Sequence, residues 1–418
     1  MKIMLRSVQV IDPQSPWNGK SVDVELKNGR VSAIDKKLQL LDGFKEIKAK
    51  GQCLSPGWFD LHADFAEPGN EWREDISTGA EAAARGGFTG VALSPLTDPV
   101  IDNKAGVEYF TRRSDDTVVE LFPKGTLTVG ARGEQMAELF DMHRSGAVAF
   151  TDDTHAVQNP NLIKLGLLYT RDFNGIVMSF PHEPNICGKG VMNEGENSTY
   201  LGLKGMPKMA EEIMVQREID LAEYTGGRLH LRTITTARSV ELIRRAKDRG
   251  FNITADVSVA HLLFSDGELR EYDTRWKVMP PLREDSDRRA LLQGLRDGTI
   301  DAVSTDHSPQ DIETKKCEFD LASFGMIALQ TAYPLLKQNL SDEEIVRYLG
   351  VQSRQVIGME APVIDIDNEI NFTLFDPAAK WTWTENEAAS KSKNSPLFGR
   401  EFSGKVVGVF RGKHSVQF

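Results

Sequence analysis

The sequence contains few of the residues that build covalent or metal-based frameworks. It has three cysteines and eight histidines in 418 residues. Cysteines more than a hundred residues apart form no Cys-x-x-Cys pair, so the spacing favours neither a disulfide framework nor a structural zinc site. We therefore expect a reducing cytoplasm as the compartment. The cysteines are Cys53, Cys187 and Cys317.

Long runs of one residue type are also missing. The apolar runs are far shorter than the roughly 18 residues that cross a bilayer. The stretch "MKIMLRSVQVID" alternates like a strand and lacks the apolar region of a signal peptide. The net charge is −11, with no lysine- and arginine-rich run that could follow a phosphate backbone. We expect neither nucleic acid nor a membrane as a partner.

The central part of the chain instead shows a regular alternation. Between about residues 56 and 340, eight short β-rich runs alternate with helix-length amphipathic segments, several of which end at glycine. This pattern predicts an α/β fold with a (β/α)8 barrel over residues 56–359. The eight runs are "WFDLH", "FTGVALS", "TLTVG", "AVAFT", "GIVMSF", "LHLRTI", "NITADVSV" and "IDAVST".

The two flanks have a different pattern. Residues 1–55 and 360–418 carry alternating β-like runs without helix-length partners, such as "SVDVELKNGRVSAID" and "GKVVGVFRGK". The "NGR" in the first run is typical of a tight hairpin turn. We predict that both ends of the chain build one small β-sandwich domain beside the barrel.

Polar residues cluster where the predicted barrel strands end, which is the rim that carries the active site in such barrels. His62 and Asp64 follow the first strand two residues apart, so both could point to one metal ion. Asp153 ends the fourth strand and Asp306 the eighth. The alternative is a set of polar strand ends hydrogen-bonded into loops. Asp152 and Asp153 also suit a helix N-cap, and His230, within a strand, suits the core.

Several longer runs carry a family resemblance. The resemblance extends over nearly the full length of the chain and is most specific in "SPGWFDLHADFAEPGNEWREDISTGAEAAARGGFTGV", "GVMNEGENSTYLGLKGMPKMAEE", "KVMPPLREDSDRRALLQGLRDGTIDAVSTDHSP" and "SKNSPLFGREFSGKV". The chain resembles a dihydroorotase of the cyclic amidohydrolase family, in its bacterial subtype that works in a multifunctional complex. The resemblance implies a metal-dependent hydrolase barrel with a small β-sandwich. It also implies the reversible closure of N-carbamoyl-aspartate to dihydroorotate in pyrimidine biosynthesis, with one or two zinc ions that activate water.

Matching the family's metal ligands one by one shows an incomplete set. His62, Asp153 and Asp306 keep the family's residues, and Asp306 would be both ligand and general base. Asp64 stands where the family has histidine, a change that zinc tolerates. Phe180 and Thr233 stand where the family has histidine ligands. The resemblance thus implies either one divalent cation held by His62, Asp64, Asp153 and Asp306, or none.

The family's substrate-binding positions have changed as well. Ala66 takes the place of the arginine that clasps the substrate carboxylate. Losing the charged partner of a buried carboxylate costs about 3–5 kcal/mol, or roughly two to four decades in affinity. We therefore expect dihydroorotate to bind poorly. The other three changed positions are Leu96 and Met279, both asparagine in the family, and Gln310, histidine in the family.

These replacements leave three hypotheses open. The first is a catalytically impaired or inactive homologue, a pseudoenzyme, with a structural role beside aspartate carbamoyltransferase or as a homodimer. The second is an active amidohydrolase with one metal ion, acting on dihydroorotate or another cyclic amide or imide. The third is a true dihydroorotase that uses His155, His182 or His307. The sequence favours the first, because framework segments are kept while chemical groups are replaced.

Overall fold

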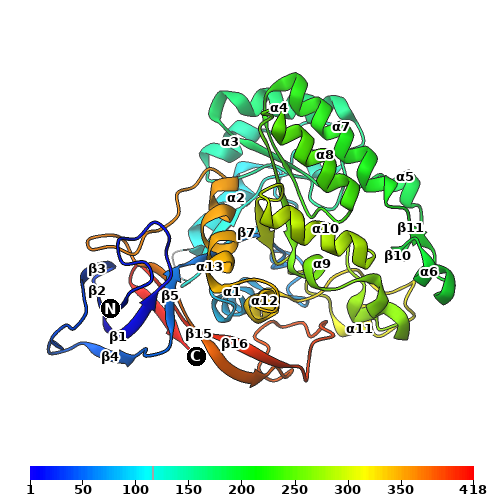
Figure 1. Cartoon of the computed structure of the whole chain (residues 1–418). Helices are drawn as coiled ribbons and strands as arrows, with labels where there is room; N and C mark the ends of the chain where they lie inside the picture. The colour runs from blue at the N-terminus through cyan, green and yellow to red at the C-terminus, as the bar shows by residue number, and fades with distance from the viewer. Residues whose placement is uncertain (115–116) are drawn as a thin grey trace.

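The fold is a parallel barrel flanked by a sheet made from both chain ends. The computed structural model describes residues 1–114 and 117–418. In Figure 1 the helices surround the barrel, and the blue and red ends of the chain meet on one side of it. No helix in these described ranges is long and apolar enough to cross a membrane.

Seven regular strands and one single-residue bridge close the barrel. Strands β6 to β8 form one parallel ladder, and β9, β12, β13 and β14 form another. Phe150 joins them by pairing with Gly125 and Val177, and Ala63 pairs with His307 to complete the ring. The strands are β6 (Trp58–Ala63), β7 (Phe88–Leu93), β8 (Glu120–Pro123), β9 (Ile176–Ser179), β12 (Arg228–Leu231), β13 (Ile253–Ser258) and β14 (Ala302–Ser304).

Two of the eight predicted strands differ from the structure. The third strand, β8, lies at Glu120–Pro123 and not at 126–130, because the chain turns at Val129–Ala131, where Gly130 has a φ of 63°. The fourth predicted strand, 147–151, keeps only the bridge at Phe150. The backbone of this segment still bonds to both neighbours, since Phe150 donates to Ile176 on one side and Thr151 donates to Gly125 on the other. The eightfold alternation therefore holds despite these two shifts.

Helices connect the barrel strands and cover their outer faces. The longest is α7, whose buried residues include Met214, Val215 and Ile219. Helix α1, the first helix after β6, begins with a capping box at Asp75, which fixes the residue at which the helix starts. The helices are α1 (Ile76–Arg85), α2 (Lys104–Arg113), α3 (Leu139–Arg144), α4 (Pro160–Thr170), α5 (Pro184–Cys187), α6 (Glu196–Leu201), α7 (Met209–Thr225), α8 (Ala237–Asp248), α9 (Val259–Leu263), α10 (Asp285–Arg296), α11 (Ile312–Lys315), α12 (Ala332–Leu336), α13 (Asp342–Ile345) and α14 (Ser353–Val356).

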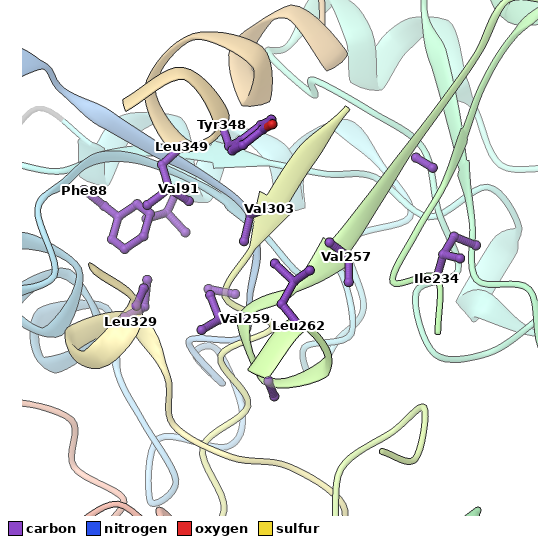
Figure 2. Close-up of a cluster of buried hydrophobic side chains, with 14 of the residues drawn as sticks. Phe88, Val91, Ile234, Val257, Val259, Leu262, Val303, Leu329, Tyr348 and Leu349 are labelled. Carbon is purple, nitrogen blue, oxygen red and sulfur yellow. The ribbon is translucent and has the colours of Figure 1, made fainter. Parts of the chain in front are cut away.

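Apolar side chains fill the space between strands and helices. Figure 2 shows Val91, Val257 and Val303 from three barrel strands in one buried cluster with Phe88 and Leu329. All five side chains are almost fully buried. Close packing of this kind holds the strand ends at fixed positions, which a site at the rim requires.

The two ends of the chain form one eight-stranded sheet. Strand β5 joins the halves, since it pairs with β1 on one side and β15 on the other. Asn28 and Gly29 form the predicted hairpin turn, both with positive φ. The sheet has its own apolar core, which includes Phe372 and Phe410. Its strands are β1 (Lys2–Val10), β2 (Ser21–Lys27), β3 (Arg30–Asp35), β4 (Lys45–Lys48), β5 (Cys53–Pro56), β15 (Asn371–Thr382), β16 (Glu401–Arg411) and β17 (His414–Gln417); a separate two-residue pair, β10 (Met192–Asn193) and β11 (Gly205–Met206), lies in the barrel loops.

Candidate active site

A cavity of about 350 Å³ opens at the rim where the barrel strands end. It brings together residues that lie up to 264 positions apart in the sequence, from His62 to Met326. Eight of the ten predicted site positions line it: His62, Asp64, Leu96, Asp153, Phe180, Met279, Asp306 and Gln310. Ala66 and Thr233 are buried beside it.

Four of the predicted positions have an unusual backbone conformation. Ala66 has a φ of 57°, and Asp153, Thr233 and Asp306 have φ values of 53°, 54° and 51°. This left-handed region is costly for side chains with a Cβ, above all for a β-branched threonine. Such strain persists where the surrounding structure enforces it, and it gathers at active sites. The rim of the barrel thus holds strained backbone positions of the kind that gather at active sites.

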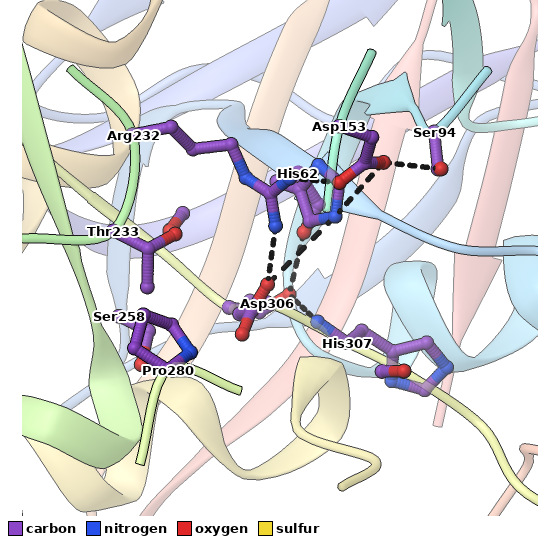
Figure 3. Close-up of polar contacts among 12 residues, drawn as sticks. His62, Ser94, Asp153, Arg232, Thr233, Ser258, Pro280, Asp306 and His307 are labelled. Atoms are coloured by element: carbon purple, nitrogen blue, oxygen red, sulfur yellow. Dashed lines mark hydrogen bonds and ion pairs between the residues drawn. The ribbon is translucent and has the colours of Figure 1, made fainter. Parts of the chain in front are cut away.

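The centre of the site is an arginine held between two aspartates. Arg232 follows strand β12 and is 1% exposed. One terminal nitrogen donates to Asp153 Oδ1, and the other donates to Asp306 Oδ1 at 2.9 Å. Ser94 donates to the second oxygen of Asp153. Figure 3 shows this arrangement, with the guanidinium pointing into the space between the two carboxylates.

His62 lies next to this ion-paired group and contacts a buried lysine. Its Nε2 is 3.6 Å from Asp153 Oδ2 and 3.7 Å from Asp306 Oδ1. Its Nδ1 is 2.7 Å from Nζ of Lys124, which also donates to the Leu61 carbonyl at 3.0 Å. Burial, helped by the charges of Arg232 and Lys124, holds the pKa of His62 well below its usual value. Burial likewise lowers the pKa of Lys124 to about 7.

Asp64 is engaged in a separate ion pair. Its Oδ2 accepts from Arg73 at 2.7 Å, and its Oδ1 accepts from the Ala66 backbone at 2.7 Å. Both oxygens therefore have hydrogen-bond partners from the chain. Asp64 lines the cavity, as expected, but its partner there is a guanidinium.

Asp152 and His230 are hydrogen-bonded within the fold and do not line the cavity. Asp152 accepts from the backbone and hydroxyl of Thr128, and Asn159, not the aspartate pair, caps α4. His230 is a satisfied core histidine, as predicted, with Nδ1 2.9 Å from Thr254 Oγ1 and Nε2 2.9 Å from Asp256.

Of the three unmatched histidines, one reaches the cavity. His182 lines it beside Phe180, with ring centroids 5.6 Å apart. His307 is 1% exposed, and its Nδ1 accepts from the backbone of Ala328 at 3.1 Å. His155 is exposed on a loop. His155, His182 and His307 therefore do not meet at one point where a metal ion could bind.

The cavity walls between the charged groups are largely apolar. Phe180 stacks on Arg232, with the guanidinium carbon 5.5 Å from the ring centroid. Leu96 and Met279, where the resemblance implies asparagine, line the walls, and Val278, Phe324 and Met326 extend the apolar surface. Ala66, where the resemblance implies a carboxylate-clasping arginine, is 1% exposed.

Sequence reasoning missed the three basic residues of the site. Arg232, Lys124 and Arg73 each contact a predicted metal-ligand position. A signal was present for both barrel-strand residues, since Arg232 directly follows strand β12 and Lys124 directly follows strand β8. Basic side chains at strand ends can enter the site just as acidic ones do.

Comparison with known proteins places the chain in a family. A family model described as dihydro-orotase-like matches residues 51–239. A dihydroorotase from Trichlorobacter lovleyi is 39% identical over 427 residues, with 99% of this chain and 100% of the relative covered. The chain belongs to the dihydroorotase family. A second member, from Pelotomaculum thermopropionicum, is 39% identical over 412 residues, covering 97% of this chain and 96% of the relative.

Solved structures with the same fold lie further away in sequence. An L-hydantoinase from Arthrobacter aurescens superposes with a TM-score of 0.85 at 19% identity, covering 99% of this chain and 96% of that one. A dihydropyrimidinase from Brevibacillus agri superposes with a TM-score of 0.82 at 19% identity, covering 100% and 95%. These similarities confirm the amidohydrolase barrel fold of this dihydroorotase-family chain.

The dihydroorotase family is one of metal-dependent amidohydrolases, so the residues present must be tested against a metal ion. Within residues 1–114 and 117–418, no three His, Cys, Asp or Glu side chains are arranged to hold one. Asp153 and Asp306 share the guanidinium of Arg232, and Asp64 binds Arg73. Zinc sites are built from three or four free donors with room for the ion. The donor set therefore does not fit a divalent cation.

Proposed function

We propose that this chain is a dihydroorotase-family protein that has lost efficient turnover of dihydroorotate and serves as a structural partner. One observation carries the proposal: both arginines that line the cavity, Arg73 and Arg232, are already paired with aspartates. An acidic substrate would have to break one of these pairs to gain a cationic partner. A buried carboxylate left without one costs about 3–5 kcal/mol.

The pairing of Asp306 adds to this loss. In the family's reaction this aspartate acts as general base, as the resemblance implies. Here its Oδ1 accepts from Arg232 at 2.9 Å, so the oxygen that would take a proton is already engaged by a guanidinium. Binding and proton transfer are therefore both impaired.

Hydrolysis of dihydroorotate by the purified full chain tests the proposal. We expect activity at least about a hundredfold below that of the Trichlorobacter lovleyi relative in the same assay, because the carboxylate clasp is missing. Added zinc should not change this result. Turnover comparable to that of the relative would contradict the proposal.

Variants sharpen the binding side of this test. Asp64→Asn should free Arg73 while keeping the acceptor for the Ala66 backbone, so dihydroorotate should bind more tightly in calorimetry than to the wild type. Glu67→Gln is the matched control, because Glu67 pairs with Arg113 at 3.1 Å and does not line the cavity. Equal binding by both variants would show that Arg73 does not limit recognition.

The partner that we propose is aspartate carbamoyltransferase, as the family resemblance implies, with a homodimer as the other assembly. Co-expression of the two chains, followed by affinity purification through a tag on either one, should recover both in a fixed ratio. Recovery of this chain alone, at concentrations where the transferase is folded and active, would contradict the partnership.

An uncharged cyclic imide is the second candidate substrate class, favoured by the apolar walls around Leu96, Met279 and Phe324. It would need no arginine for a carboxylate. A ring-opening assay on hydantoin and dihydrouracil, with the same purified full chain, tests this second candidate. Turnover of these at rates typical of enzymes, a kcat of about 1 s⁻¹ or more, would favour this reading over the structural role.

A further inference from the structure

The site contains its own fixed cations at the position where the family's metal ligands converge. Arg232 is 1% exposed, and its two terminal nitrogens bind Asp153 and Asp306. Both aspartates are retained family ligand positions from opposite sides of the barrel. The ring of Phe180, at a replaced ligand position, stacks on the same guanidinium. Phe180 thus packs against the guanidinium of Arg232, and Asp153 and Asp306 bind it.

A second built-in cation acts on the remaining family ligand, His62. Nζ of Lys124 is 2.7 Å from His62 Nδ1 and 3.0 Å from the Leu61 carbonyl. When Lys124 is protonated its ammonium group has only donors, so Nδ1 accepts and the ring proton lies on Nε2. Nε2 is the nitrogen that faces Asp153 and Asp306. In this tautomer it has no lone pair to give to a metal.

The charges of this group balance without any added ion. The carboxylates of Asp153 and Asp306 carry two negative charges, and Arg232 and Lys124 can supply two positive ones. Asp64 and Arg73 form a further pair at the cavity wall. A divalent cation entering here would meet a guanidinium that cannot be deprotonated in a protein. Like charges at such close range repel strongly in a buried site.

We infer that Arg232 is a resident cation that replaces the metal ion of this barrel, and that Lys124 holds His62 in a form that does not bind metal. The inference goes beyond the proposed loss of dihydroorotate turnover. Metal-independent turnover would contradict the proposed function and leave this inference standing, whereas a metal ion bound among these residues would contradict this inference whatever the activity.

Thermal unfolding and metal content of the full chain test the inference without an activity assay. The wild type, purified from zinc-supplemented cells, should contain no stoichiometric metal, and its Tm should not change with excess EDTA or zinc. Arg232→Met removes the charge between two carboxylates, so its Tm should fall, and zinc should raise it again by several degrees because a bound ligand stabilises the folded state.

The matched control is Arg354→Met. Arg354 is also buried, at 3% exposure, but its guanidinium donates to the Gly57 and Gly350 carbonyls and to Thr89, not to a carboxylate pair. Its Tm should fall without recovery in zinc. Equal responses of the two variants to zinc, or no response of Arg232→Met, would overturn the role of Arg232.

A double variant tests the role of Lys124. Arg232→Met/Lys124→Met should bind zinc at least about tenfold more tightly than Arg232→Met, because His62 can then present a free Nε2 lone pair, and partners of a ligating histidine typically change affinity by 10–100-fold. Equal affinity would remove Lys124 from the inference. If the variants do not fold, the wild-type measurement decides alone, since stoichiometric zinc at the aspartates overturns the inference and its absence after zinc loading supports it.

Discussion

At the scale of single residues, the site combines a strained backbone with carboxylates that are paired to arginine. Asp153, Thr233 and Asp306 share the left-handed conformation at three strand ends. Threonine is a poor choice for that conformation, and the Oγ1 of Thr233 is buried with no hydrogen-bond partner within the described part of the chain. The position thus carries two costs, one from its backbone conformation and one from its unpaired hydroxyl.

This cost makes Thr233→Gly a useful variant. Glycine adopts a φ of 54° without the steric penalty of about 1–2 kcal/mol and removes the unpaired hydroxyl. The added flexibility of glycine costs roughly 0.5–1 kcal/mol. We expect the free energy of unfolding, measured with urea, to stay equal or rise by up to about 1 kcal/mol.

Thr254→Gly is the control for this prediction. Thr254 lies within strand β13, where its hydroxyl contacts His230 at 2.9 Å, so glycine there should cost about 1 kcal/mol or more. A loss at Thr233 as large as the loss at Thr254 would show that Thr233 is well accommodated and that the strand end stores no strain.

The sequence could predict part of this residue-scale description. His62, Asp64, Asp153 and Asp306 do line one cavity, because carboxyl ends of parallel strands meet at one rim. The partners of these residues could not be predicted. Which way the long side chains of Arg232 and Lys124 turn depends on the packing of Phe180 and on the loop carbonyls, and neither follows from strand periodicity.

At the scale of secondary-structure elements, the loops at the rim rely on buried lysines. Lys315, the last residue of α11, is 3% exposed and donates to the Ser323 carbonyl at 2.8 Å and the Lys277 carbonyl at 3.3 Å. Burial, together with the charge of Lys277, lowers the pKa of Lys315 to about 7. The short helix is therefore attached to the 277 and 323 segments by a group that can be neutral near physiological pH.

This lowered pKa predicts a pH-dependent stability. Above pH 7 the folded protein releases the proton of Lys315, while the unfolded chain keeps it up to its ordinary pKa of 10.5, so the unfolded state binds more protons and stability rises with pH. Between pH 7 and 9 the wild type should gain about 1–2 kcal/mol relative to Lys315→Met in urea unfolding.

The neighbouring Lys316, which is exposed, provides the control. Lys316→Met should differ from the wild type by the same amount at both pH values. A constant difference for Lys315→Met as well would mean that Lys315 stays charged in the folded protein at both pH values.

Element boundaries were the weakest part of the sequence-based prediction. The third strand lies at Glu120–Pro123 although the stretch 126–130 looks more β-like, because Gly130 allows a turn there. Residues 147–151 read as a full strand but pair through Phe150 alone. Local patterns specify that an element exists, while its ends depend on pairing with distant strands.

At the scale of the whole molecule, the architecture followed from the sequence more fully than the site did. Eight strand–helix units predict the barrel, and unpaired β-like flanks predict a sheet from both chain ends, as observed in Figure 1. These features rest on many residues each, so single deviations do not alter them. The chemistry of the site depends on a few side chains, so the position of a single guanidinium decides whether the carboxylates are free or paired.

This contrast gives the account its central claim: the family framework remains, with internal cations in place of a metal centre. The framework is closely packed, for example where the buried Trp58 ring contacts Phe88 edge-on and Tyr333 in a tilted arrangement. A scaffold of this kind can keep its binding surfaces without its active site, since a fold does not by itself specify a function.

Anomalous X-ray scattering at the zinc absorption edge, from wild-type crystals grown with zinc, tests this claim most directly. We predict no anomalous peak between Asp153 and Asp306, and clear density for the Arg232 guanidinium bridging the two carboxylates. An anomalous peak within bonding distance of His62 and Asp306, with Arg232 displaced from the site, would contradict the account.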